Sequence, residues 1–196
     1  MLPISENTNP SPIELEKDYF SRDTNKTLQE VYKLESDFSS STVLHTFGKT
    51  LEEKLFDARA DVKILISQVS MYLDDNVRGK LFDEIDILHD ADEWEDGDEP
   101  VSLESFKTFL RWYYLNKPNN LPSFGLSVAG NFIASWMDGD TKNSLVLEFL
   151  KNDRIKWFVT KYYGDEIDSS VGTSQLVRVH EILLAYDANN IFFSVE

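Results

Sequence analysis

Hydrophobic residues in this chain change their spacing near residue 120, and that change limits the folds it can adopt. Between residues 51 and 117 they recur every three or four positions, which places them on one face of a helix. Between residues 124 and 159 they recur at every second position, which places them on one face of a β-strand. The sequence therefore predicts helices followed by strands, an α+β fold.

Three apolar stripes predict three helices. Asp74 or Asp75 can cap the second helix and Ser102 the third, because a side-chain oxygen there accepts a hydrogen bond from a free backbone N–H. Pro118 ends the third helix, which is mildly basic. The first two are expected to form an antiparallel hairpin. The stripes are Leu55, Ala58, Val62, Leu65, Ile66, Val69 and Leu73; then Val77, Leu81, Ile85 and Leu88; then Leu103, Phe106, Leu110 and Tyr113.

Four alternating runs predict an antiparallel meander over residues 124–163. Turn residues separate consecutive runs at Gly130–Asn131, Asp138–Gly139 and Asn152–Asp153. One face of this sheet carries Leu, Phe and Trp, so the helices are expected to cover it. The alternating residues are Phe124, Leu126 and Val128; Phe132, Ala134 and Trp136; Leu145, Leu147 and Phe149; and Ile155, Trp157 and Val159.

The remaining segments complete the predicted domain. Residues 164–172 are polar and are expected to form a loop, and Thr173 to cap a last helix over residues 173–187. Residues 1–25 contain three prolines and no sustained apolar period, which predicts a flexible tail. We thus expect one α+β domain over residues 26–196, with a helical part (26–117) packed on a four-stranded antiparallel meander (124–163) and followed by a C-terminal helix (173–187).

Composition excludes several classes of protein. The chain has no cysteine, so it holds no disulfide, zinc–thiolate site or thiol nucleophile. No leader-like segment and no run of about 20 apolar residues is visible, which favours a cytoplasmic protein. A net charge of −16 opposes direct binding to nucleic-acid phosphates and to anionic membranes. It favours a basic protein partner.

Most of that charge lies between Asp74 and Val101. This segment holds twelve carboxylates against Arg78 and Lys80, a net charge of −10. A charge run commonly marks only a solvated face. Between Asp83 and Glu99, however, ten acids stand without one Lys or Arg among them, and their mutual repulsion costs folding free energy. That cost favours a functional use of the field.

We therefore predict a partner-binding surface in this segment. Trp94 lies between two glutamates, where solubility alone does not call for an indole, and Trp is a common interface anchor. The alternative is that its ring folds back onto the helix pair. The basic residues of the meander could hold the acidic segment internally, bind an anion or form an ordinary exposed sheet face. The predicted binding residues are Asp83, Glu84, Asp86, Asp90, Asp92, Glu93, Trp94, Glu95 and Asp96.

Metal and catalytic motifs do not emerge. An EF-hand alignment on Gly97 places Trp94 and Leu103 at ligand positions, so the calcium pattern fails, although loose binding of divalent ions by several carboxylates stays open. No nucleophile elbow, phosphate-binding loop or dinucleotide fingerprint is present. We predict no cofactor, metal or catalytic residue. The alternative is an enzyme whose site is assembled in space, with His89 or His180 as base.

Three parts of the sequence resemble an uncharacterised family of small acidic bacterial proteins. They are the runs Gly130–Trp136 and Leu147–Trp157, which match its strand–turn–strand signature, and the helical residues from Asp61 to Val69. The resemblance extends over about half of the chain. It implies a bacterial cytoplasmic protein with an accessory, non-enzymatic role, and it carries no site residue.

The function that these patterns favour is an acidic protein-binding module. It would act like an inhibitor, an antitoxin or an immunity protein and present its carboxylates to a basic, nucleic-acid-binding protein. A phage anti-defence protein that mimics DNA is an alternative based on the same physics. A subunit that buries exposed Phe and Tyr against copies of itself is another, and the sequence leaves the oligomeric state open.

Overall fold

The computed structural model describes residues 29, 33, 49–90, 94 and 97–186. Its helices are α3 (Leu51–Gln68), the 3₁₀ turn η1 (Ser70–Tyr72), α4 (Asp75–Ile87), α5 (Leu103–Asn116), the 3₁₀ turn η3 (Leu176–Arg178) and α6 (Val179–Ala185). Its strands are β1 (Ser123–Leu126), β2 (Phe132–Met137), β3 (Ser144–Leu150), β4 (Arg154–Tyr163) and β5 (Glu166–Gln175).

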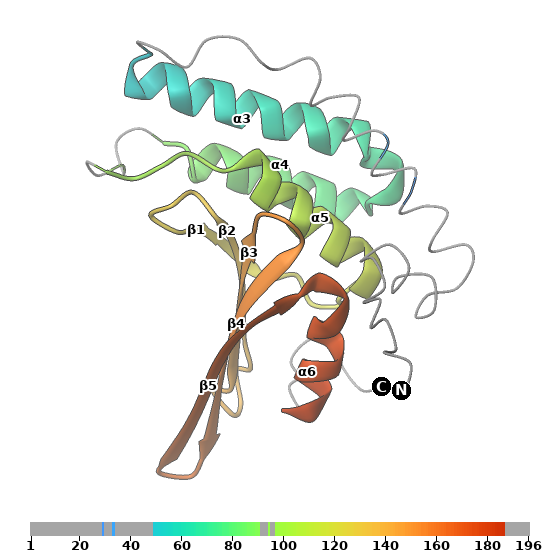
Figure 1. Ribbon diagram of the computed structural model, residues 1–196, viewed down its shortest axis with the longest axis vertical. Helices are drawn as coiled ribbons and strands as arrows, with labels where there is room; N and C mark the ends of the chain where they lie inside the picture. The colour runs from blue at the N-terminus through green and yellow to red at the C-terminus, as the bar shows by residue number, and fades with distance from the viewer. Residues whose placement is uncertain (1–28, 30–32, 34–48, 91–93, 95–96, 187–196) are drawn as a thin grey trace, which may run out of the picture.

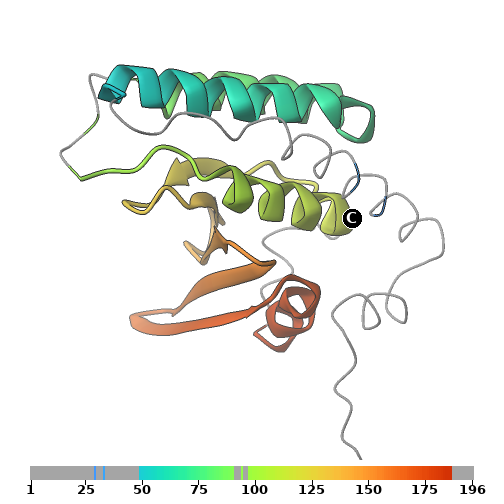
Figure 2. The same ribbon diagram turned by 45° about the horizontal axis from the view of Figure 1, so that its top comes forward.

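The helices cover one face of the sheet in layers (Figures 1 and 2). Helices α3 and α4 lie side by side in an outer layer, and α5 lies between them and the sheet. Helix α6 lies against the strands at the other end of the same face, where Tyr186 contacts the inward Trp157 ring at a centroid distance of 5.2 Å. The predicted α+β class, with N-terminal helices before the strands and one helix after them, is therefore correct.

The sheet has five antiparallel strands in the order β1-β2-β3-β4-β5, one more than predicted. The predicted alternation is confirmed for β2, β3 and β4, whose inward side chains are all buried. The turn at Asn152–Asp153 is confirmed as well, since both residues have positive φ, of 60° and 54°. Alternation predicted these strands well because one of their faces is buried and the other is open.

The fifth strand corrects the prediction of a loop over residues 164–172. β5 pairs with β4 over ten consecutive residues, from Glu166 opposite Tyr163 to Gln175 opposite Arg154. Gly164 has φ +64° and begins the two-residue turn between them. The strand carries little apolar signal because most of its side chains are exposed. Backbone pairing to β4, which no side-chain pattern reports, makes this segment a strand.

The C-terminal helix also begins later than predicted. Thr173 pairs with Lys156 inside β5 and caps no helix. Helix α6 starts at Val179, after the 3₁₀ turn η3. Leu176 of η3 and Val179 and Leu183 of α6 are nevertheless buried in the core.

Helices α3 and α4 follow the predicted hairpin with two differences. Thr50 and Glu53 form a capping box at the start of α3, in which each side chain bonds the other's backbone N–H. Helix α3 ends at Gln68, so Leu73 is buried from the connection and not from the helix. Asp74 occupies the N-cap position of α4, but its side chain makes no cap hydrogen bond.

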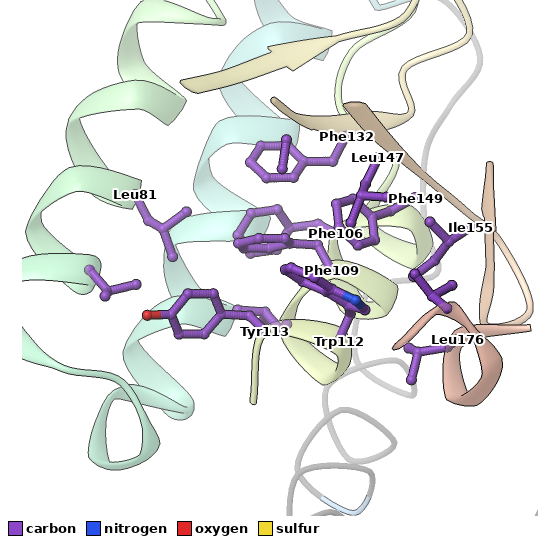
Figure 3. Packing of buried hydrophobic residues seen from close by; sticks show 14 of the residues in the cluster. Leu81, Phe106, Phe109, Trp112, Tyr113, Phe132, Leu147, Phe149, Ile155 and Leu176 are labelled. Atoms are coloured by element: carbon purple, nitrogen blue, oxygen red, sulfur yellow. The ribbon is translucent and has the colours of Figure 1, made fainter. Parts of the chain in front are cut away.

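Helix α5 is enclosed by the other elements and forms the centre of the core (Figure 3). We predicted a single apolar stripe on a mildly basic helix, but nine consecutive residues from Ser105 to Tyr113 are buried. Phe109 packs on Phe132 and Phe149 of the sheet, and Tyr113 points toward α4. Ser102 caps this helix as predicted, accepting from the N–H of Ser105 at 3.5 Å. Its position between two layers explains why a single stripe underestimates its burial.

Several predictions concern residues outside the described part of the chain. These are the tail over residues 1–25, most of residues 26–48 at the start of the predicted helical part and four of the predicted binding residues, Asp92, Glu93, Glu95 and Asp96. Across the described residues, no helix combines the length and apolar character needed to cross a bilayer.

Candidate acidic binding surface

The described acids of α4 divide between two sides of that helix. Asp83 and Glu84 line a groove on one side, and Asp86 and Asp90 line a cleft on the other, toward α3. The division follows from the helical period, because residues three or four positions apart share a face. The four described acids of the predicted site therefore lie on two surfaces, and the structure brings each pair together with further acids.

The cleft between α3 and the end of α4 has a volume of about 730 Å³. Five of its lining residues are acidic, and only Lys49 and Arg59 are basic. Sequence reasoning missed the three acids of this cleft that α3 supplies. Their spacing along the exposed side of α3 is the signal that could have found them. The acids are Glu52, Glu53, Asp57, Asp86 and Asp90.

Two bases of α3, and Lys49 just before it, neutralise part of this charge. Asp86 accepts from Lys63 at 2.5 Å and lies 3.7 Å from the guanidinium of Arg59. Asp57 forms an ion pair with Lys49. The acidic run has no Lys or Arg between Asp83 and Glu99, but tertiary packing brings in basic groups from another helix. Asp86 is therefore occupied by internal partners.

Asp83 and Glu84 are the two predicted binding residues that line the groove, and Asp83 is exposed whereas Glu84 is half-buried. Within the described part of the chain neither makes an ion pair. Their groove, of about 380 Å³, also includes Asp75 and Lys80. The ammonium of Lys80 is turned away from these acids, because it donates to the carbonyl of Pro122 at 2.8 Å.

Exposed apolar side chains lie beside both acidic surfaces. Phe56 lines the cleft and is 60% exposed, with the guanidinium of Arg59 at 5.7 Å from its ring centroid. Ile87 lines the groove and is also 60% exposed. Neither was predicted, because both fall off the apolar stripes that identified their helices. An apolar centre with a charged rim is the usual anatomy of a protein interface.

His89 is a structural residue at the end of α4. It is buried, and its Nδ1 lies 2.8 Å from the carbonyl oxygen of Ile85. Its Nε2 accepts from the backbone N–H of Val101 at 3.3 Å, so the ring is neutral and Nδ1 donates. Burial lowers the pKa of His89 and outweighs the opposite effect of the Ile85 bond. With both nitrogens engaged, this ring is a poor candidate for a general base.

Trp94 folds back toward the helix pair. It is half-buried, and its ring centroid lies 5.9 Å from that of His89. The end of the acidic segment is held to the β1–β2 turn, where the N–H of Glu99 donates to Val128 and that of Ser102 to Gly130. Of the two interpretations of Trp94, the contact with His89 supports folding back. It places Trp94 beside His89, which lines the cleft.

The sheet carries its own charge pairs. Lys156 lies 3.7 Å from Glu148, and Arg111 of α5 contacts Asp153 of the β3–β4 turn at 2.9 Å. Among the described residues, no group of three or more His, Asp or Glu side chains is placed to hold a metal ion. His180, the other candidate base, is exposed on α6 and lines neither acidic surface.

Comparison of the chain with protein-family models, with curated proteins and with solved structures found no match. The resemblance to small acidic bacterial proteins thus stays a prediction.

Proposed function

We propose that this protein is a binding module that presents the carboxylates of α3 and α4 to a basic partner protein. The observation that carries the proposal is the cleft beside Phe56, in which five acids face two bases around an exposed aromatic ring. Its action would be that of an inhibitor, antitoxin or immunity protein: it occupies a functional surface of the partner.

Electrostatics favours such a partner at two ranges. The chain's charge of −16 attracts a basic protein from a distance and raises its association rate. At contact, the five acids and two bases lining the cleft leave a net charge of −3, that is 2 minus 5. Asp83 and Glu84 add an uncompensated pair on the other side of α4. A partner that spans α4 therefore meets negative charge on both sides.

Phe56 supplies the apolar part of the contact. Arg59 already lies over its ring, which shows that the ring accepts a guanidinium at this position. An arginine of the partner could take the opposite face while bonding to Glu52 or Glu53. Desolvation of an exposed aromatic ring at the centre of the contact would contribute more affinity than the rim charges alone.

The partner class follows from the same chemistry. A protein that binds nucleic acid carries Lys and Arg spaced to meet phosphates, and carboxylates can occupy the same groups. The module would therefore block the site by direct competition with the nucleic acid. Mimicry of DNA by a phage protein would use the same residues, and it is distinguished by the identity of the captured partner.

The test is capture of partners from a bacterial lysate by the wild type and by two matched variants. The test variant, Glu52→Gln/Asp83→Asn/Glu84→Gln, removes three charges from the α3–α4 surface. The control, Asp138→Asn/Asp140→Asn/Glu181→Gln, removes three from the β2–β3 turn and α6. All three proteins are compared at about 0.1 M and about 1 M salt, where the Debye length is about 10 Å and about 3 Å.

We expect the wild type and the control to retain a basic protein at low salt and to release it at high salt. The test variant should bind between about threefold and about a hundredfold more weakly, since each of the three exposed charge pairs contributes about 0.2–1 kcal/mol. Equal retention by all three proteins, or equal loss in the test and control variants, would contradict a specific site. A partner that binds nucleic acid, and that nucleic acid displaces from the module, would identify the competition.

A further inference from the structure

The two edges of the sheet differ in how they are protected. β1, at one edge, has four residues and follows Pro122, and short strands and prolines discourage pairing with another chain. β5, at the other edge, has ten residues in unbroken register with β4. It contains no proline, lysine or bulge. Among the described residues it pairs only with β4, so no described strand occupies its second edge.

The side chains of β5 suit a close approach by another strand. Ser169, Ser170 and Gly172 are small and occupy its middle. On the outer face of the sheet, Ile167 is 62% exposed and Val171 is 60% exposed. A new strand would bury both of these apolar side chains while it satisfies the open backbone groups.

Charges along this edge are opposite at its two ends. Asp165 and Glu166 stand at the start of β5, beside the turn. Arg154 pairs with Gln175 at the other end, and Arg178 follows directly in η3. All four charged residues are exposed, and none makes an ion pair with another described residue. An antiparallel copy of the same strand would place each acidic end beside a basic end.

We propose that β5 pairs with β5 of a second copy of this chain, antiparallel and about a two-fold axis near Val171. The two sheets would then continue as one sheet of ten strands. A two-fold contact joins identical patches, so it requires a patch whose charges reverse from one end to the other. This edge meets that requirement, because its acidic end would lie beside Arg154 and Arg178 of the other copy. If both ends were basic, the two copies would repel each other.

The dimer would leave the proposed acidic surface free. Helix α3 and the tip of the β4–β5 hairpin lie at opposite ends of the molecule (Figure 1). Each dimer would therefore present two acidic surfaces, and a partner with two basic sites could bind both at once. Self-association itself does not depend on the proposed function, so either proposal can fail without the other.

Two complementary charge variants test the contact. Asp165→Lys/Glu166→Lys makes both ends of the edge basic, and Arg154→Glu/Arg178→Glu makes both acidic. In sedimentation velocity over a concentration series, the wild type should form a dimer, and each variant alone should associate at least about tenfold more weakly. An equimolar mixture of the variants should recover the dimer, because each basic end then meets an acidic one. Recovery also shows that both variants are folded.

Engineered cysteines locate the contact, because the chain has no cysteine of its own. Under mild oxidation, Val171→Cys should form a disulfide-linked dimer, since a residue at the axis lies opposite itself. Val128→Cys, 69% exposed in the β1–β2 turn, is the control and should stay monomeric. A wild type that stays monomeric at every concentration, or a variant mixture that does not recover the dimer, would overturn the proposal. So would a monomer whose outward β5 amides resist hydrogen exchange, because another segment would then occupy the edge.

Discussion

The imidazole of His89 accepts a hydrogen bond from the backbone N–H of Val101, with 3.3 Å between Nε2 and the nitrogen. This bond crosses the acidic segment and joins the end of α4 to the residues before α5. The other ring nitrogen donates to Ile85 within α4. One neutral side chain thus closes a loop that carries many like charges, and Trp94 packs against its ring.

Acid should weaken the fold through His89. The pKa of His89 is lower in the folded protein than in the unfolded chain, where it is about 6.5. At pH values between these two pKa values, His89 is protonated in the unfolded chain but not in the folded protein. Stability is therefore fully present above about pH 6.5 and falls as pH decreases toward the folded pKa, by up to about 1.4 kcal/mol per pH unit. Urea unfolding of the wild type and of His89→Gln between about pH 5 and pH 7.5 measures this. The variant should be less stable throughout and show a smaller dependence on pH; an unchanged dependence would contradict the assignment.

Removing the charge of Asp61 should stabilise the protein at neutral pH. Burial and the nearby charge of Asp57 raise the pKa of Asp61, so its ionised form is disfavoured in the fold. Relative to low pH, the folded protein therefore loses stability as the pH rises past 3.8. A salt-bridged acid has the opposite pH dependence, because its lowered pKa makes the protein lose stability as the pH falls. We expect Asp61→Asn to raise the free energy of unfolding at pH 7 by a few tenths to about 1 kcal/mol, allowing for solvent screening. Asp165→Asn, which changes the net charge equally, should have no comparable effect, and neither should Asp61→Asn near pH 3.

A methyl group at position 172 should disrupt the packing of β5 on Trp157. A Cβ at Gly172 would lie 2.7 Å from the indole Cε2 of that residue, well inside van der Waals contact. Gly172→Ala is expected to cost about 1–3 kcal/mol in thermal or urea unfolding. The matched control is Gly139→Ala, where no atom lies within 4 Å, and it should change stability by less than about 0.5 kcal/mol. If the clash is the cause, adding Trp157→Phe to Gly172→Ala should cost less than the sum of the two single changes.

The contact between Arg111 and Asp153 should contribute to stability. Arg111 is buried on α5, and its Nε forms an ion pair with the Asp153 carboxylate at 2.9 Å. Asp153→Asn keeps a residue that tolerates the positive φ there but leaves a buried guanidinium without its counter-charge. Because the carboxylate is partly exposed, we expect a loss of about 1–3 kcal/mol, less than for a fully buried pair. Asp140→Asn in the β2–β3 turn is the same chemical change on an exposed residue and should be near neutral; an equal loss there would refute the pairing as the cause.

The sequence by itself determined the elements that have one buried face. Val62, Leu65 and Ile66 identify α3, and the alternation through Leu145, Leu147 and Phe149 identifies β3, because in each case burial on one side selects a period. The negative charge of residues 74–101 was equally visible in the sequence. These features depend on neighbours along the chain.

Tertiary structure decided the rest, because it brings together residues that are far apart in sequence. β5 is a strand because β4 lies beside it, and its exposed side chains leave no periodic signal. Lys107 and Arg111 are buried because α5 lies between two layers, which no property of α5 alone reports. The acids of α3 join Asp86 and Asp90 in one cleft, and Arg59 and Lys63 partly neutralise it, only because α3 packs on α4. Spacing along a chain predicts which face of an element is buried, whereas the partner of that face depends on packing.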